Sequence, residues 1–542
     1  MVVGLVVLGA ALRFGVGSRP LEALDGRTLP DDAYLSLSLA REIGRGAGPL
    51  YAGQPTNGFQ PLYVFALAPL FASAEPQELD ETEFLDRALR AGIALGGVCD
   101  TASIALLAAA LAARFGWGPA PVIGAALYAT QPLFLRTAAN GLETSLAILL
   151  LSAAWLWRER RCGAGAGAAA WFGLGAWLGL AFLARVDAAL AAPFVAWPRE
   201  RSAGPGGPRA RGVPPARLAA AAAGALVCAA PWLAYSHAWT GLLFPESGAA
   251  VRFQALAAAG HDPSLRFYRY AIGRALADLW RGAEPLWLCA GAALASRPWL
   301  ASRGAAALAP RARAALAAGL GYALCLLVAY LALVPAYWFF HRYLVPVALL
   351  PLLLASALGA RSLEQLLPGR FARGAALAGL ALALALPGLL HPRTRELLQA
   401  RHDPRLGYRQ IGLWAAAHFA PGTVIGSWQS GALGYYATRL RVVNLDGVVN
   451  GAALRSLRER RQIDYLREAG VEYVLGWPVN ETSLRAHSRP GSQRWLESVG
   501  SVPGLRSWRQ PWRIHRVVPR RGAAAAGGAR LSARGAGAPS SR

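Results

Sequence analysis

Two adjacent carboxylates, Asp31 and Asp32, follow Pro30 and open a helix that the sequence predicts over residues 33–43. One interpretation is structural, because a carboxylate after proline can cap free amides and face the positive end of a helix dipole. The other is chemical. Of two adjacent carboxylates, one can cap while the other acts as a general base, its pKa raised by its neighbour and by poor hydration. Both interpretations fit these residues.

A second polar group, Asn57-Gly-Phe59-Gln60-Pro, stands before an apolar stretch that begins at Leu62. It is typical of a turn that precedes a helix. Its amides and its aromatic ring would also suit a sugar. The apolar stretch runs to residue 72, which is short for a span, so we expect an interfacial or re-entrant helix.

Two further polar groups stand at the ends of apolar blocks. Asn140 and Glu143 precede one block, where they could form a capping box. The Glu143 carboxylate, at a membrane boundary, could instead contact substrate. Arg185 and Asp187 interrupt another apolar stretch. They could be a salt-bridged pair at the lipid–water boundary, and their depth also allows a functional role.

His341, Arg342 and Tyr343 open a later apolar block. Arg342 could snorkel towards the membrane surface. A bound lipid phosphate would need a fixed cation at this depth, and the planar guanidinium of arginine matches phosphate oxygens. The segment is therefore a candidate phosphate site.

The elements that must position these residues are predicted from the hydropathy of the chain. Of its 542 residues, 55% are hydrophobic and 16% charged, against about a quarter charged in soluble proteins. The apolar residues form long blocks, several of them near the ~20 residues that span a bilayer. The blocks are 2–16, 88–113, 119–136, 142–158, 166–184, 187–197, 216–236, 282–296, 314–336, 342–358 and 374–390. They predict a mainly α, polytopic membrane bundle with about eleven transmembrane helices.

The net charge of +25 comes from arginine alone. The arginines mostly occupy alternate loops between the apolar blocks, which predicts a cytoplasmic N-terminus by the positive-inside rule. The loop 17–87 and all the polar groups above then share the extracytoplasmic side. A nucleic-acid binder would gather its basic residues on one face with aromatics between them, so no nucleic-acid partner is expected. We expect a multi-pass protein of a bacterial inner membrane.

Several chemistries lack support in the sequence. No phosphate-binding loop occurs, which argues against an ATP-driven pump, and no His/Cys/carboxylate group has metal-ligand spacing. We therefore expect no cofactor and no divalent metal. The five cysteines show no CxxC spacing. The first span lacks the basic region of a cleaved signal peptide and is short, so we expect it to be retained, with a natural start codon upstream.

The composition changes after residue 390. Residues 396–518 alternate strand-like and helix-like pieces, which predicts a small extracytoplasmic α/β domain. Strands are predicted at 423–428, 441–445, 471–475 and 512–518, and helices at 405–418, 451–469 and 493–499. Residues 519–542 are mostly Ala, Gly, Arg and Ser and predict a disordered tail.

The order of these motifs resembles a known family. Pro-Asp-Asp-Ala-Tyr-x-Ser at 30–36, Asn-Gly-Phe at 57–59, Asn-Gly-Leu-Glu-Thr at 140–144 and Arg-Tyr-Leu-Val-Pro at 342–346 are similar to motifs of the polytopic GT-C glycosyltransferases. The likeness is strongest to bacterial arabinofuranosyltransferase-like and mannosyltransferase-like members. Gln60, and Val186 in Arg-Val-Asp, depart from the usual pattern, which leaves the sugar open.

The resemblance implies a polyprenyl-phosphate sugar donor and an extracytoplasmic glycan, lipid or protein acceptor. It implies Asp31 as the general base, with Asp32 and Glu143 supporting. Because a lipid phosphate is already a good leaving group, one base and one arginine suffice in principle, and we expect a single displacement that inverts the anomeric centre. The residues expected to bind substrate are Tyr34, Asn57, Phe59, Gln60, Glu143, Arg185, Asp187, His341, Arg342 and Tyr343. The alternatives are a non-catalytic lipid or solute transporter, which often shows internal repeats, and a membrane phosphotransferase that acts on lipids.

Overall fold

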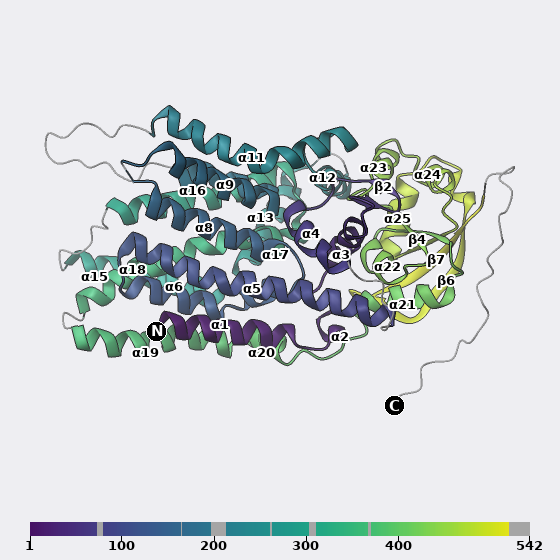
Figure 1. Ribbon diagram of the computed structural model, residues 1–542. Helices are drawn as coiled ribbons and strands as arrows, with labels where there is room; N and C mark the ends of the chain where they lie inside the picture. The colour runs from purple at the N-terminus through teal and green to yellow at the C-terminus, as the bar shows by residue number, and fades with distance from the viewer. Residues whose placement is uncertain are drawn as a thin grey trace.

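The computed structural model describes residues 1–72, 80–163, 165–196, 213–260, 263–302, 310–366 and 370–519. A bundle of long helices makes up most of the chain, and a small α/β domain lies at one end of it (Figure 1). The predicted mainly helical bundle with a C-terminal α/β domain is confirmed. The predicted disordered tail lies, apart from Pro519, outside the described residues.

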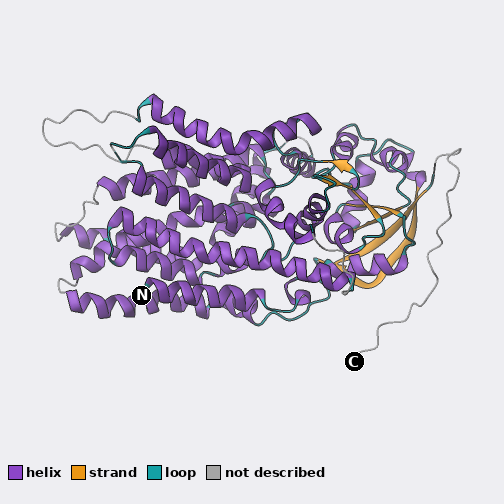
Figure 2. Cartoon of the chain, in the orientation of Figure 1, coloured by secondary structure: helices purple, strands orange, loops and turns teal. Residues whose placement is uncertain are grey.

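The apolar blocks form helices that run along the bundle (Figures 1 and 2). They are α1 (Val2–Gly17), α5 (Glu81–Phe115), α6 (Pro119–Thr130), α8 (Thr144–Arg161), α9 (Ala168–Ala184), α11 (Pro215–Thr240), α14 (Glu284–Ala295), α16 (Pro310–Leu333), α18 (Leu349–Leu366) and α19 (Arg370–Leu390). The remaining helices of this part of the chain are α7 (Pro132–Ala138), η2 (Val186–Ala191), α10 (Ala192–Ala196), α12 (Glu246–Ala258), α13 (Leu265–Trp280), α15 (Arg297–Ser302), η3 (Tyr337–Phe339), α17 (Phe340–Tyr343), η4 (Val345–Ala348) and α20 (Pro392–Leu398).

The described residues include four helices that are long and apolar enough to cross a membrane, namely α5, α11, α16 and the continuous helix Val345–Leu366. A fifth span results if α19 and α20, which meet at a 67° bend, are counted together. Several other apolar helices, such as α1 and α9, are shorter than 18 residues. The chain is a multi-pass membrane protein, and the figure of about eleven crossings stays a prediction.

Close helix contacts in the bundle depend on small residues and on buried ion pairs, of which Arg13–Asp100 is an example. A Cβ atom on Gly175 of α9 would lie 1.8 Å from the backbone oxygen of Ala221 in α11, so glycine lets these two helices approach. Arg13, the charged residue of α1, donates to Asp100 of α5 at 2.5 Å, and Tyr128 of α6 donates to the same carboxylate at 2.7 Å. These hydrogen bonds offset the free-energy cost of burying the charges of Arg13 and Asp100.

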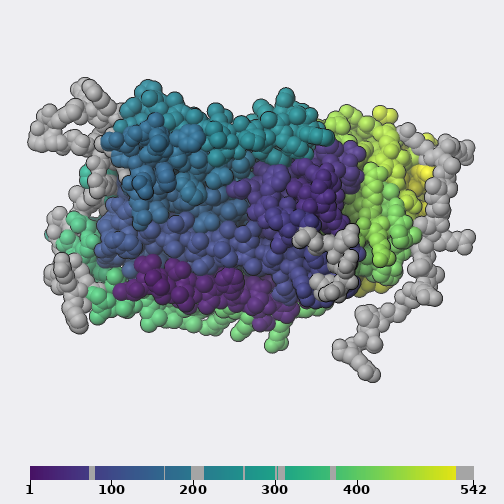
Figure 3. Space-filling model, viewed as in Figure 1, coloured from purple at the N-terminus to yellow at the C-terminus, as the bar shows by residue number. Residues whose placement is uncertain are grey.

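The loop after α1 folds against the end of the bundle. It contains α2 (Leu21–Leu24), α3 (Asp31–Gly44), a short hairpin of β1 (Leu50–Tyr51) and β2 (Gln54–Pro55), α4 (Pro61–Leu67) and η1 (Ala68–Phe71). The helices predicted at 33–43 and from residue 62 are present as α3 and as α4 with η1. In Figure 3 this loop borders the C-terminal domain directly.

The α/β domain carries a five-stranded sheet of order β4-β3-β5-β7-β6. Strands β3 (Val424–Ser427), β4 (Arg441–Asn444) and β5 (Tyr473–Gly476) are parallel, whereas β7 (Gln510–Val517) is antiparallel to both β5 and β6 (Leu496–Ser507). Its helices are α21 (Arg409–His418), α22 (Ser430–Tyr436), α23 (Gly451–Arg458), α24 (Gln462–Glu468), α25 (Pro478–Ala486) and η5 (Ser492–Trp495).

The four predicted strands correspond to β3, β4, β5 and β7. The helix predicted at 493–499 is wrong beyond Trp495, because β6 begins at Leu496. This strand pairs with β7 in a hairpin, so its backbone hydrogen bonds come from a partner that the local sequence pattern does not reveal. The predicted helix 451–469 is broken between α23 and α24, where Arg460 has a φ of 52°.

The first loop holds the α/β domain through backbone groups at the ends of its helices. The carboxylate of Asp25 accepts the N–H groups of Tyr408 and Arg409 at the start of α21, both at 2.7 Å. Arg41 of α3 donates to the carbonyls of Gly434 and Tyr435 at the end of α22. The Asp25 carboxylate thus meets the positive end of the α21 dipole, and the Arg41 guanidinium meets the negative end of the α22 dipole. Both contacts hold the α/β domain against the bundle.

Candidate active site

A cavity of about 490 Å³ lies between the first loop, the α/β domain and the end of the helix bundle. The start of α3 forms one wall, α7 and the segment from Trp338 to Val345 form the membrane-side wall, and the loops after β3, β4 and β5 form the third. Four of the residues predicted from the sequence line it: Asp31, Asp32, His341 and Arg342. Segments more than 400 residues apart in the chain therefore share one cavity.

Asp31 lies where the first loop meets helix α22. Its two carboxylate oxygens accept the N–H groups of Gly431 and Ala432, at 2.8 and 3.0 Å, at the start of that helix. Asp31 thus caps a helix, but one 400 residues away and not its own. Burial raises the pKa of Asp31 to about 7, although the two amides oppose the increase.

Gly431 is the residue that lets α22 approach this carboxylate. A Cβ atom added there would lie 2.1 Å from the backbone oxygen of Asp31 and 3.0 Å from its carboxyl carbon. The close contact therefore needs a residue without a side chain.

Asp32 points towards the membrane-side wall. Its carboxylate forms an ion pair of 2.5 Å with Arg342, whose side chain is 12% exposed, while that of Asp32 is 44% exposed. The Arg342 guanidinium also lies 4.5 Å from the ring of Phe339, which restricts its orientation. The cavity thus has one arginine held in place by a carboxylate and a ring.

Two further nitrogen-bearing side chains flank Arg342. Burial, reinforced by Arg136 and Arg342, lowers the pKa of His341 to about 3, so its imidazole is neutral at physiological pH. Arg136 of α7 lines the same cavity and forms no ion pair with any of the described residues. The membrane-side wall therefore carries two cations, of which only one is paired with a carboxylate. Such a wall can accept an anion.

The α/β domain contributes Asp446, which follows β4 and also lines the cavity. Its carboxylate accepts the N–H of Val448 at 2.9 Å. Burial raises the pKa of Asp446 to about 7, and the nearby charge of Asp32 acts in the same direction. Asp31, Asp32 and Asp446 thus influence one another across the cavity.

A second charged cluster lies behind the membrane-side wall. Arg185 donates to Glu143 at 2.9 Å and to both oxygens of Asp187 at 2.7 and 3.0 Å, and Tyr330 donates to Asp187 at 2.5 Å. Tyr343, next to Arg342, stacks on Tyr330 with ring centroids 4.8 Å apart. The anticipated salt bridge of Arg185 and Asp187 is present, and Glu143 pairs with Arg185 instead of completing a capping box. None of these five residues lines the cavity.

Four other predicted substrate-binding residues pack elsewhere. Tyr34 is buried and donates to Asp25, while Asn57 is buried and donates to the Ser236 hydroxyl and to two backbone carbonyls. Phe59 packs edge-on against Trp232 with centroids 5.1 Å apart, and Gln60 accepts the N–H of Val186 at 3.4 Å. In this structure these side chains stabilise the first loop, and substrate contact by them stays a prediction.

Sequence reasoning missed Arg136, Asp446 and the aromatic residues that follow β3 and β5. Arg136 ends a predicted apolar block, as topology-determining arginines often do. Asp446 lies in Asp-Gly, a common turn signal. Only the predicted strands could have indicated Asp446 and the aromatic residues. Residues at the carboxyl ends of neighbouring parallel strands lie together at one edge of a sheet, where ligands often bind.

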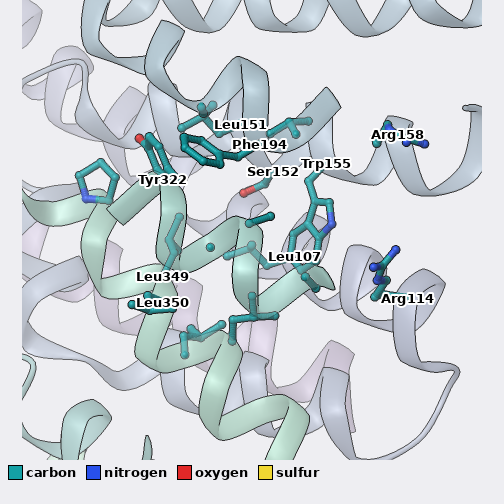
Figure 4. Close-up of a pocket in the computed structure, with 18 of the residues that line it drawn as sticks. Leu107, Arg114, Leu151, Ser152, Trp155, Arg158, Phe194, Tyr322, Leu349 and Leu350 are labelled. Atoms are coloured by element: carbon teal, nitrogen blue, oxygen red, sulfur yellow. The ribbon is translucent and has the colours of Figure 1, made fainter. Parts of the chain in front are cut away.

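An apolar pocket of about 150 Å³ lies deeper in the bundle, between α5, α8, α10, α16 and α18. Figure 4 shows Leu151, Phe194 and Leu349 around it, with Tyr322 at one end and two arginines at the other. Neighbouring residues of η4 line the two cavities, Val345 the polar one and Pro346 the apolar one.

The described part of the chain has no group of three His, Cys, Asp or Glu side chains placed to hold a metal ion. The carboxylates of the cavity are divided instead between backbone amides, for Asp31 and Asp446, and a guanidinium, for Asp32.

Comparisons with known proteins extend these observations. Residues 396–525 match a family described as a domain of unknown function (DUF8728). A comparison of the sequence with curated proteins finds no match. Among solved structures, ArnT from Cupriavidus metallidurans in the apo state has a TM-score of 0.53 at 17% identity, with 94% of this chain and 98% of that chain covered. ArnT bound to undecaprenyl phosphate has a TM-score of 0.52 at 17% identity, with the same shares covered.

An oligosaccharyltransferase from Archaeoglobus fulgidus, in complex with zinc and sulfate, has a TM-score of 0.52 at 14% identity. That match covers 92% of this chain and 71% of the other. Both comparisons include the helix bundle and the α/β domain in one alignment. The chain has the GT-C fold of these membrane glycosyltransferases.

Proposed function

We propose that this protein is a membrane glycosyltransferase that moves a sugar from a polyprenyl phosphate to a hydroxyl of an extracytoplasmic acceptor. The observation that carries the proposal is a single cavity that has a cationic membrane-side wall and is also lined by the buried carboxylate of Asp31. The structures of ArnT with undecaprenyl phosphate and of an oligosaccharyltransferase, which share the fold, support this kind of reaction.

The donor phosphate would bind at the membrane-side wall. Arg342 offers a planar guanidinium whose orientation is held by Asp32 and Phe339, and Arg136 offers a second cation without a carboxylate partner among the described residues. Arginine can bind phosphate oxygens in a bidentate manner. Neutral His341 adds a hydrogen-bonding group without a charge. The polyprenyl chain would follow the apolar pocket that begins beside Pro346.

Asp31 would act as the general base. Asp32 pairs directly with the arginine that would hold the leaving phosphate, so it stands on the phosphate side of the reacting carbon. An inverting displacement needs its base on the opposite side. Asp31 faces the α/β domain, and burial raises its pKa to about 7, close to the ideal for a base at neutral pH.

The proposed step is a single displacement. The acceptor oxygen forms a bond to the anomeric carbon while its proton passes to Asp31. The bond between that carbon and the phosphate oxygen breaks, and the polyprenyl phosphate leaves with the electron pair. Arg342 and Arg136 stabilise the charge that develops on the phosphate. The products are an inverted glycoside and polyprenyl phosphate.

The test is a transfer assay with the full chain in lipid nanodiscs and a set of synthetic polyprenyl-phosphate sugars. We expect donor consumption that depends on an added acceptor extract, with inverted configuration of the product by NMR. A carrier would move lipid without consuming donor, and a phosphotransferase would release free sugar phosphate or move phosphate. Either result would refute the proposal, and a retained configuration would refute the single displacement.

A further inference from the structure

The carboxyl ends of the parallel strands β3, β4 and β5 form the cavity wall that lies opposite the helix bundle. The sheet order is β4-β3-β5, so the chain leaves β3 on one side and returns across it to β5. Loops that leave neighbouring parallel strands in opposite directions open a crevice between them, and α/β sheets bind ligands there. This crevice opens into the cavity that holds Asp31.

The crevice contains polar atoms without a partner. After β3, the side-chain oxygen of Gln429 is buried, and after β5 the indole nitrogen of Trp477 is buried. Neither has a hydrogen-bond partner within the part of the chain that the structure describes. Both residues line the cavity, and buried polar groups are almost always paired, so an open acceptor and an open donor there indicate a ligand that supplies the complementary groups. Asp446 adds a carboxylate with capacity for further bonds.

A strained turn presents an aromatic ring at the same cavity. The hairpin of β6 and β7 turns through Trp508 and Arg509, whose φ angles are 48° and 64°. Two-residue hairpin turns of this kind favour Asn-Gly, because both central residues need positive φ. Here Trp508 is 47% exposed and lines the cavity. Trp428 and Trp477 line it from the strand ends, so three indoles surround the crevice.

These groups match a sugar ring. A pyranose or furanose has an apolar face of C–H groups, which packs on an indole, and a rim of hydroxyls, each of which donates and accepts. Gln429 and Asp446 can accept from such hydroxyls, and Trp477 can donate to one. A hydrocarbon tail would leave these polar groups unpaired, at an energetic cost.

The charges of the cavity indicate that this sugar is neutral. Asp446 forms no ion pair with any of the described residues, and Asp31 adds a second carboxylate nearby. A phosphorylated or carboxylated ligand would be repelled by these carboxylates, whereas Arg342 and Arg136 lie on the opposite, membrane-side wall. Arg27, the third arginine that lines the cavity, is paired with Glu396. One wall of the cavity therefore suits an anionic substrate, and the opposite wall suits an uncharged one.

We propose that the crevice at the carboxyl ends of β3, β4 and β5 binds a neutral sugar residue of the acceptor, which is therefore a glycan. The proposal rests on the proposed glycosyl transfer, since it assigns one of the two substrates of that reaction. It places the attacking hydroxyl between Asp446 and Asp31, on the side of the reacting carbon opposite the phosphate.

The test measures binding without the donor. Neutral methyl glycosides of mannose, galactose, glucose and arabinose are titrated, by saturation-transfer NMR, onto the full chain in nanodiscs. The variants are Gln429→Ala, whose side chain forms no hydrogen bond with the described residues, and Trp508→Ala, whose ring is exposed. The matched control is Gln493→Ala, in η5 of the same domain, exposed and outside the cavity.

We expect at least one glycoside to bind, with affinity reduced about tenfold by each variant and unchanged by the control. Absence of glycoside binding, an equal effect of the control, or specific binding of a serine- or threonine-containing peptide or a phospholipid instead would overturn the proposal. Glycoside binding without any sugar transfer would refute the proposed function and leave the sugar site standing. Transfer with an acceptor KM that both variants leave unchanged would refute the sugar site alone.

Discussion

Replacement of Asp31 by asparagine tests whether this carboxylate does chemistry or only holds α22. Each of its oxygens accepts a backbone N–H, at 2.8 and 3.0 Å. Asparagine keeps one accepting oxygen and places an NH₂ group against the second amide. One charge-assisted hydrogen bond is lost and a donor faces a donor, which costs about 1.5–3 kcal/mol. Some loss of stability is therefore expected whatever the chemical role.

Asp25 offers a matched control. Its Oδ2 accepts the N–H groups of Tyr408 and Arg409, both at 2.7 Å, at the start of α21, and its Oδ1 accepts the Tyr34 hydroxyl at 2.8 Å. Asp25→Asn therefore removes the charge from a comparable contact between the first loop and the start of a helix. Asp25 does not line the cavity. We therefore expect both variants to lower the Tm, whereas only Asp31→Asn removes a base, for which proton transfer contributes about 10²–10⁴ in rate.

The assay is single-turnover donor consumption in nanodiscs across pH, with the Tm measured on the same samples. In the wild type the rate should rise with pH through an apparent pKa near 7, because Asp31 must be ionised to accept a proton. Asp31→Asn should be slower by at least about 100-fold, with a flat profile between pH 6 and 8. Asp25→Asn should keep the wild-type profile. Equal loss of activity in both variants, or an unchanged profile in Asp31→Asn, would refute the assignment.

Four further outcomes follow from the geometry. Arg342→Gln should raise the donor KM by about tenfold or more, whereas Arg87→Gln, an exposed arginine paired with a glutamate of its own helix, should not, and equal KM values would contradict a phosphate site. Gly431→Ala should lower both Tm and rate, because its Cβ would meet a backbone oxygen at 2.1 Å, while Gly248→Ala, with open space around it, serves as the neutral comparison. Burial raises the pKa of Asp25 from 3.8 to about 6, so between these pH values the folded state keeps a proton that the unfolded state has lost. The stabilisation that this proton gives to the folded state is fully present below about pH 4 and is lost as the pH rises through 6. The Tm should therefore fall between pH 4.5 and 6.5, with a smaller slope in Asp25→Asn, and an equal slope would argue against it. Addition of EDTA should leave the transfer rate unchanged, and activity restored by Mg²⁺ or Mn²⁺ after chelation would show that a metal is needed.

Much of the architecture follows from local properties of the sequence. Apolar blocks predict the bundle helices because transfer of each side chain into an apolar environment depends mainly on that side chain. Three of the four predicted strands, β3, β4 and β5, are short, apolar and bounded by turn residues, which is a local signal too. The strand β6 escaped prediction because eight of its twelve residues, 497–501, 503, 504 and 506, are exposed and its order depends on pairing with β7.

The active-site residues show where local reasoning ends. Asp31, Asp32, His341 and Arg342 could be identified from the sequence. Ionisable residues at the ends of apolar blocks cost free energy to place near a membrane, so they often have a function. The sequence could not separate the two aspartates. Neighbours on one helix point in different directions, so one reaches α22 and the other Arg342, and only the packing of the α/β domain decides which does which.

The sequence by itself determined that this chain enters a membrane, that a small α/β domain follows, and that one short acidic motif stands outside the apolar blocks. The tertiary structure alone decided that the Asp31 carboxylate caps a helix 400 residues away, and that Arg136 and Asp446 share its cavity. The physical reason is that hydrophobic partition acts residue by residue, whereas hydrogen-bond partners and electrostatic fields depend on which distant segments pack together.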